Sequence, residues 1–111
     1  TRQIAHEATI DLLHRHADLA GLYVAGGGME GAILALREEG RSGHPVAVVN
    51  EITPDTRSAL TDGVVATAIA TPLPELCREV VGAMVRRLSG EGAEAPGETF
   101  LPFDIYLPEN I

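Results

Sequence analysis

Leu22-Tyr23-Val24-Ala25-Gly26-Gly27-Gly28-Met29-Glu30-Gly31 is an apolar run that ends in glycines and continues into a helical pattern. Such a run predicts a buried strand, a tight turn and the start of a helix. Four glycines among six residues allow left-handed backbone angles and the close approach of another group, and the first N–H groups of the helix lack partners within it. We therefore expect Gly26, Gly27 and Gly28 to form a binding loop.

The rest of the chain alternates helical and strand patterns around this stretch. We expect helices at 2–16, 29–39, 53–62 and 73–89, and strands at 22–25, 45–50, 64–70 and within 100–111. This order predicts an α/β fold with a doubly wound, mainly parallel sheet, helices on both faces and right-handed crossovers. Prolines at 102 and 108 place the last strand at the sheet edge. The polar, glycine-rich composition of 89–99 predicts a flexible connector.

Three segments follow the expected parallel strands, and they should meet at one edge of the sheet. They are 26–28, 50–53 and 70–71. Ligands of open α/β sheets bind beyond the carboxyl ends of the strands. This edge is therefore the expected ligand site.

The composition fits one folded domain. The chain has 111 residues, 45% of them hydrophobic, which is enough for one α/β unit but small for a two-domain enzyme. Its net charge of −8, from 8 basic and 16 acidic residues, argues against direct binding of nucleic acid, because phosphate binding needs a basic face. No apolar run of membrane-spanning length and no secretory leader is visible, so we expect no membrane partner.

Cysteine and histidine do not suggest a metal site. Cys77 is the single cysteine, which excludes an internal disulfide, and its helical setting predicts a small buried side chain. His14 and His16 are two residues apart and so lie on different helix faces. His6-Glu7 lacks the second histidine of a zinc-protease helix. We expect no catalytic residue, no metal and no cofactor.

One alternative is a dinucleotide-binding domain. Gly26-x-Gly28-x-x-Gly31 matches the glycine fingerprint, and Glu51 ends the next apolar run, where a ribose partner would lie. Against this alternative, a helix precedes the glycine strand, the chain has no room for a catalytic domain, and no proton-transfer pair accompanies the glycines.

Several segments together carry a likeness to a known family. Their order and spacing resemble the C-terminal part of the effector-binding domain of lac-repressor-type transcription regulators, which shares the fold of type I periplasmic sugar-binding proteins. The likeness spans nearly all of residues 1–111, and the closing segment favours the regulators over the transport proteins. The segments are 17–25 (ADLAGLYVA), 31–40 (GAILALREEG), 45–51 (PVAVVNE), 53–55, Leu60, 62–63, 66–68, Pro72 and 105–111 (IYLPENI).

The resemblance implies that a sugar or another small polar effector binds between two lobes, without catalysis. Glu51 matches an acid that accepts hydrogen bonds from ligand hydroxyls, Asn50 lies beside it, and Thr71 matches a polar position on the rim. The loop 26–28 departs from the family pattern, in which Asn-Asp is common, and offers backbone N–H groups instead. Glu51 could also be an ordinary solvated strand end.

The resemblance also implies partners. A DNA-binding domain and the first lobe would precede Thr1, so this segment would contact DNA only through the missing N-terminal domain of a cytoplasmic regulator. Residues 70–72 would be a hinge that crosses to the other lobe, where helix 73–89 would normally pack; in the isolated segment this helix would pack either on its own sheet or on another copy. We expect a homodimer with Met29, Ile33 and Leu36 near its two-fold axis. The remaining alternative is the sugar-binding component of an uptake system.

Two tyrosines and one aspartate are assigned structural roles rather than ligand contacts. We expect Tyr23 and Tyr106 to be packing residues, because a chain with two tyrosines and no tryptophan has little aromatic surface for stacking a ligand. Asp55, in the first turn of a helix, fits the helix dipole better than a ligand contact.

Overall fold

The computed structural model describes residues 1–90 and 97–111. These residues divide into two compact units. The first unit comprises Thr1–Ala70 and Ile105–Ile111, and the second comprises Thr71–Asp104. The central part of the expected connector, residues 91–96, lies outside the described residues.

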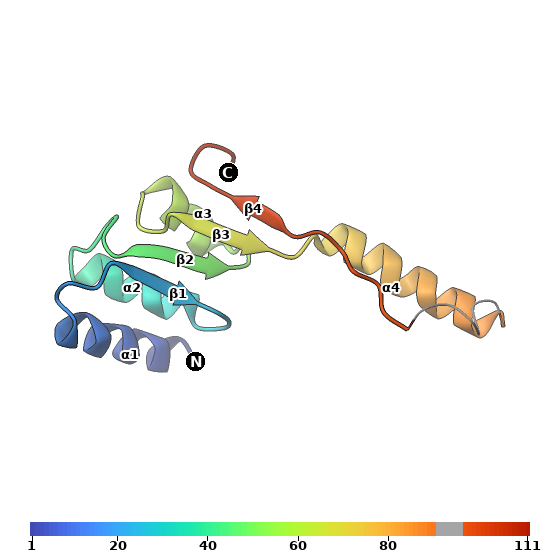
Figure 1. Cartoon of the computed structure of the whole chain (residues 1–111), viewed down its shortest axis with the longest axis horizontal. Coiled ribbons are helices and arrows are strands. Elements are labelled where there is room, and N and C mark those ends of the chain that lie inside the picture. Colours follow the sequence, from blue (N-terminus) through green and yellow to red (C-terminus); the bar gives the residue numbers. More distant parts are fainter. Residues whose placement is uncertain (91–96) are drawn as a thin grey trace. The chain divides into compact units, whose positions relative to one another are not determined.

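The first unit is built on a four-stranded sheet in the order β1-β2-β3-β4 (Figure 1). Strands β1 to β3 pair in parallel, with Tyr23 opposite Val48 and Val49 opposite Ala68. The last strand lies at the sheet edge, as its prolines predict. The elements are α1 (Arg2–Arg15), β1 (Gly21–Val24), α2 (Met29–Glu38), β2 (Val46–Asn50), α3 (Pro54–Thr61), β3 (Thr67–Ala70) and β4 (Asp104–Tyr106).

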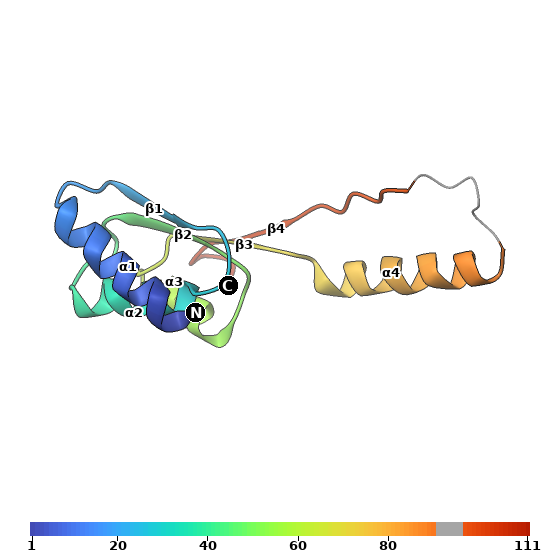
Figure 2. The same ribbon diagram turned by 90° about the horizontal axis from the view of Figure 1, so that it is seen from below.

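The three helices of the first unit lie on one face of the sheet, as Figure 2 shows. The expected α/β fold with a mainly parallel sheet is present, but the second helical layer is not found among the described residues. The reason is topological for α2 and α3: β1, β2 and β3 are added in one direction, so right-handed crossovers place both connecting helices on the same side, and α1 packs on α2. The uncovered face carries Tyr23 and Val46, which are both exposed.

Helix ends follow the local sequence. The Thr53 hydroxyl accepts a hydrogen bond from the Thr56 backbone N–H at 3.2 Å, and the Thr56 hydroxyl accepts one from the Thr53 N–H at 2.7 Å. This reciprocal cap, followed by Pro54, fixes the start of α3. Gly40 has a φ of 63° just after α2, as expected for a glycine that ends a helix.

The core lies between the sheet and the helices. The side chains of Met29, Ile33 and Leu36 are buried there, so they form no exposed surface. The expected role of Met29, Ile33 and Leu36 in a dimer interface is therefore corrected: these side chains belong to the core. An interface between two copies at α2 would have to use other side chains of this helix. Val64 and Val65 are also buried but precede β3 rather than belonging to it. Tyr106 packs against this core, as expected.

Helix α1 lies close against α2 because of two glycines. A Cβ at Gly31 would collide with the carbonyl oxygen of Arg2, and one at Gly28 would lie 2.7 Å from the Cβ of Ala5. The space that these residues leave open is therefore filled by the backbone and side chains of α1.

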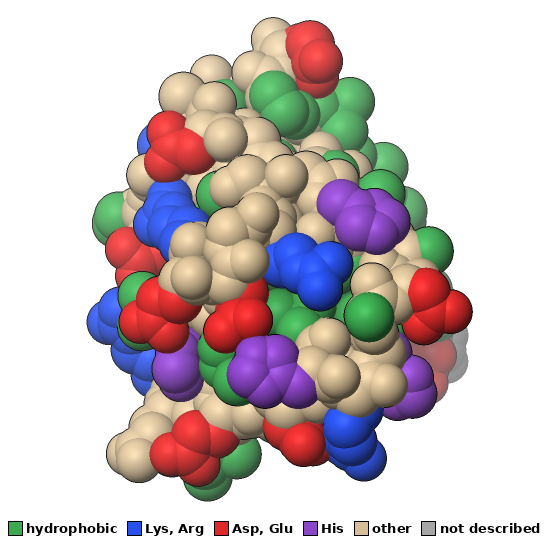
Figure 3. Space-filling view, turned by 90° about the vertical axis from the view of Figure 1, so that its left-hand side faces the viewer, with side chains coloured by type: hydrophobic (Ala, Val, Ile, Leu, Met, Phe, Trp, Pro, Cys, Tyr) green, Lys and Arg blue, Asp and Glu red, His purple; other side chains and the backbone are tan. Residues whose placement is uncertain are grey.

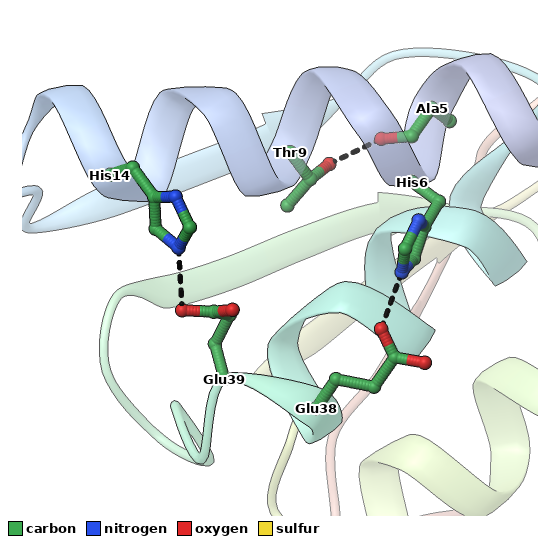
Figure 4. Close-up of polar contacts among 6 residues, drawn as sticks. All are labelled: Ala5, His6, Thr9, His14, Glu38 and Glu39. Carbon is green, nitrogen blue, oxygen red and sulfur yellow. Dashed lines mark hydrogen bonds and ion pairs between the residues drawn. The ribbon is translucent and has the colours of Figure 1, made fainter.

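Polar contacts hold the same two helices together (Figure 4). His6 Nε2 lies 2.6 Å from Glu38 Oε2, and His14 Nε2 lies 3.0 Å from Glu39 Oε2. The hydroxyl of Thr9, which is buried, is satisfied within α1, where it donates to the carbonyl oxygen of Ala5 at 2.7 Å. The histidines thus pair with carboxylates rather than with one another.

The second unit contains one long helix, α4 (Leu73–Leu88), close to its expected bounds. None of its residues is buried. Cys77 is exposed, so the expectation of a buried thiol was wrong: none of the described residues covers this side chain. Within residues 1–90 and 97–111, none of the helices has the length and apolar character that crossing a bilayer requires.

Candidate functional site

The carboxyl ends of the three parallel strands share one edge of the sheet (Figure 1). Residues 25–28 leave β1 there, Asn50 is the last residue of β2, and Ala70 is the last residue of β3. The first unit thereby brings together the glycine loop and the Asn50-Glu51 pair. Loops at this edge are the usual ligand sites of such sheets.

The glycines of the loop have two different roles. No atom lies within 4 Å of a Cβ placed at Gly26 or Gly27, so these two positions are open. Gly28 has a φ of 104° and precedes α2 without a side-chain cap, while Gly28 and Gly31 both pack against α1. Two of the three glycines of the apparent dinucleotide fingerprint are therefore explained by helix packing.

Asn50 ties the ends of two strands together. Its Oδ1 accepts a hydrogen bond from the Tyr23 hydroxyl at 3.1 Å, and its Nδ2 donates to the carbonyl oxygen of Ala25 at 3.1 Å. These bonds orient the amide and leave one N–H and one lone pair for another group.

Tyr23 is not the packing residue that the sequence suggested, because 57% of its surface is exposed. The signal that could have revealed this is the alternation of β1, since Leu22 and Val24 face the core and the residue between them must face away.

Glu51 has a conformation that is rare for its residue type. Its φ is 67°, in the left-handed region that costs a residue with a Cβ about 1–2 kcal/mol. The backbone N–H of Glu51 donates to Ile69 at 2.7 Å, and its carbonyl oxygen accepts from the Thr56 hydroxyl at 3.1 Å. Backbone strain of this kind is often found at binding sites.

Thr71, the third expected site residue, directly follows β3 and is the first residue of the second unit. Its carbonyl oxygen accepts a hydrogen bond from the N–H of Leu73 at 2.8 Å. The structure therefore groups Asn50, Glu51 and the glycine loop in one unit and assigns Thr71 to the other.

A groove of about 290 Å³ runs between α1 and β1 and reaches Gly26 and Gly27. Most of its lining is apolar, including Leu12, Leu22 and Val24. It offers few groups to a polar ligand, so the polar site is the Asn50-Glu51 edge. Among the residues that the structure describes, no three His, Cys, Asp or Glu side chains gather as metal ligands would.

Charges of both signs lie on the face of the molecule that Figure 3 draws. On the face shown in Figure 3, acidic, basic and histidine side chains are interspersed with apolar ones. A phosphate backbone needs a continuous basic stripe. This mixed face is not of that kind.

Asn50, Glu51 and the open loop together offer a carboxylate, an amide and backbone N–H groups. This donor and acceptor set suits the hydroxyl groups of a small polar ligand.

Neither a family model nor a curated protein sequence matches the chain. Solved structures do match it. A glucose-galactose binding protein, GanP, from Geobacillus stearothermophilus has a TM-score of 0.89 at 19% identity, over 100% of this chain and 39% of that protein. An ABC transporter solute binding protein from Agrobacterium vitis with bound D-fucose has a TM-score of 0.86 at 22% identity, over 99% of this chain and 38% of that protein.

A second solute binding protein from Agrobacterium vitis, bound with α-D-tagatopyranose, has a TM-score of 0.88 at 21% identity, over 98% of this chain and 36% of that protein. The chain thus spans about two-fifths of the length of these solved proteins. Its expected fold class is confirmed: the chain has the α/β fold, with a mainly parallel sheet, of the lobes of type I periplasmic-binding-protein-like proteins.

Proposed function

We propose that this chain is part of a non-catalytic protein that binds a sugar at the carboxyl edge of β1 and β2. The observation that carries the proposal is Glu51, held in a left-handed conformation beside an oriented Asn50. A strained acid at this edge is expected where ligand binding requires a carboxylate in a fixed direction.

Sugars fit this edge by their chemistry. A carboxylate accepts hydrogen bonds from two adjacent hydroxyls, and the remaining N–H and lone pair of Asn50 serve a third. Gly26 and Gly27 carry no side chains and are exposed, so a hydroxyl oxygen can approach the backbone of this loop. The similar solved proteins are named for glucose and galactose, D-fucose and tagatose, which supports a hexose-sized ligand.

The site in this chain is one side of a binding cleft in the proposed full-length protein. The similar proteins are more than twice as long as the matched region, so we infer that a second lobe supplies the opposite wall and any aromatic ring that stacks on the sugar. Bridging of the two lobes by the ligand would stabilise one relative geometry over others. Thr71, which directly follows β3, is a candidate rim residue of that cleft.

Two biological settings use such a protein. The first is an effector-sensing transcription regulator, a cytoplasmic homodimer that binds DNA through a separate N-terminal domain; the resemblance of residues 105–111 to the regulators favours it. The second is the binding component of a sugar uptake system, which the names of the similar solved proteins favour. The coding sequence ahead of Thr1 distinguishes them, since a helix-turn-helix indicates the regulator and a secretory leader the uptake protein.

Isothermal titration calorimetry of the full-length protein tests the binding proposal. We expect heat of binding with D-galactose, D-fucose or D-tagatose, and its loss in a Glu51→Gly variant, which removes the carboxylate but tolerates the backbone angle. Glu30→Gln, a matched loss of charge in the first turn of α2, should bind normally. Binding of NAD with no response to any sugar would instead support the dinucleotide alternative.

A further inference from the structure

Tyr23 and Asn50 come from neighbouring strands and meet on one face of the sheet. The register sets Tyr23 opposite Val48, so Asn50 lies two residues further along β2 and on the same face. Two residues of a strand span about 7 Å, a distance that a tyrosine side chain covers. The pairing of β1 with β2 therefore brings the Tyr23 hydroxyl to the end of β2, 3.1 Å from Asn50 Oδ1.

The direction of each hydrogen bond around Asn50 is fixed by the chemistry of its partners. The carbonyl oxygen of Ala25 can only accept, so the end of the amide that faces it at 3.1 Å is the NH2 group. The oxygen of the amide then faces Tyr23, whose hydroxyl must donate its proton. Tyr23, Asn50 and Ala25 thus form one chain of hydrogen bonds with a single polarity.

Two hydrogen bonds hold the amide of Asn50 in a way that one does not. The bond to Ala25 alone would leave the amide free to swing about that bond, whereas a second bond at its other end fixes the plane of the group. The remaining N–H and lone pair of Asn50 then keep constant directions beside Glu51. A donor and an acceptor in fixed directions distinguish sugars by the directions of their hydroxyls, because a misplaced hydroxyl leaves polar groups unpaired.

We propose that Tyr23 is a positioning residue that sets the sugar specificity of the site through Asn50. This inference rests on the proposed function and adds a residue that acts on Asn50 rather than on the ligand. The same hydrogen bonds reach the glycine loop, because Ala25 is the residue before Gly26. Loss of the tyrosine hydroxyl should therefore affect both Asn50 and the start of the loop.

NMR of the ligand-free chain tests the positioning role. Tyr23→Phe, which removes only the hydroxyl, should shift the side-chain 15N–1H signals of Asn50 and the backbone amide signal of Gly26. In an Asn50→Ala background the same substitution should leave the Gly26 signal in place, because the hydroxyl acts on the loop only through Asn50. Tyr106→Phe is the matched control, since Tyr106 lies on β4 at the opposite edge of the sheet from β1. Asn50 signals that do not move in Tyr23→Phe, or a Gly26 shift that persists without Asn50, overturn the inference.

Calorimetric titration of the full-length protein with D-galactose, D-glucose and D-mannose tests the specificity, because these sugars differ only in the directions of ring hydroxyls. Tyr23→Phe should lower the ratio of the weakest to the tightest dissociation constant by about two- to tenfold, which corresponds to the net contribution of one hydrogen bond. Tyr106→Phe should keep the wild-type ratio. A wild type that binds none of the sugars overturns the proposed function and this inference with it. Wild-type and Tyr23→Phe proteins that bind sugars with the same ratio overturn this inference alone.

Discussion

The backbone N–H of Glu51 donates to the carbonyl oxygen of Ile69 at 2.7 Å, one residue beyond the end of β2. The last registered pair of β2 and β3 is Asn50 with Ile69. The bond from Glu51 therefore extends this pairing by one residue. The same residue has a φ of 67°. The hydrogen bond to Ile69 thus holds Glu51 in its left-handed conformation at the edge of the sheet.

The strain at Glu51 predicts an unusual order of stability among its variants. Glu51→Val should lower the free energy of unfolding by about 1–2 kcal/mol, because a β-branched residue fits poorly at positive φ. Glu51→Gly should be near neutral or stabilising, since glycine adopts this angle freely. Chemical denaturation of both variants measures the difference. A valine variant as stable as the glycine variant would show that the left-handed angle is not maintained.

The contact of Gly31 with α1 predicts a second effect on stability. Gly31→Ala should destabilise the first unit by about 1–3 kcal/mol, because the added methyl group meets the backbone of α1 and not a flexible side chain. The matched variant Gly26→Ala should change little, because the space there is open. Equal effects of the two substitutions, measured by urea unfolding, would contradict the close approach of the helices.

The buried position of Leu36 predicts that its truncation acts on folding. Leu36→Ala should lower the free energy of unfolding by about 2–5 kcal/mol, whereas Leu88→Ala, at an exposed position, should leave it nearly unchanged. Sedimentation of the same variants separates folding from association. A Leu36→Ala chain with an unchanged free energy of unfolding and a lost dimer would contradict this account and support the interface predicted from the sequence.

The reciprocal cap at the start of α3 predicts a smaller effect. Thr53→Ala should cost about 1 kcal/mol, because it leaves the N–H of Thr56 without its acceptor. Thr61→Ala is the control, since its hydroxyl donates to a carbonyl within the exposed end of the same helix. Thermal unfolding that shifts equally in both variants would argue against a special contribution from the cap.

The elements of the first unit could be predicted because their local signals agree. The apolar run before Gly26, the Thr53-Pro54 start and Gly40 each set an element boundary through backbone chemistry that acts within a few residues. The meeting of the strand ends at one edge then follows from parallel pairing alone.

Other features depend on contacts between distant residues and could not be predicted in this way. Periodicity gives Met29, Ile33 and Leu36 a common face but does not say whether it meets the sheet or another molecule. The glycine pattern predicts close approach at Gly31 but does not identify α1 as the neighbour. Cys77 is left uncovered by the residues that the structure describes, and helical spacing does not reveal whether a residue of a helix is covered.

The most direct test of the central proposal is a 15N–1H NMR titration of the chain with D-galactose, which detects the weak binding expected of one lobe. The proposal predicts saturable shifts of the amide signals of Gly26, Gly27, Asn50 and Glu51, which are lost in Glu51→Gly and kept in Glu30→Gln. Shifts confined to other surfaces, or no shifts with any hexose tested while NAD perturbs the glycine loop, would contradict it.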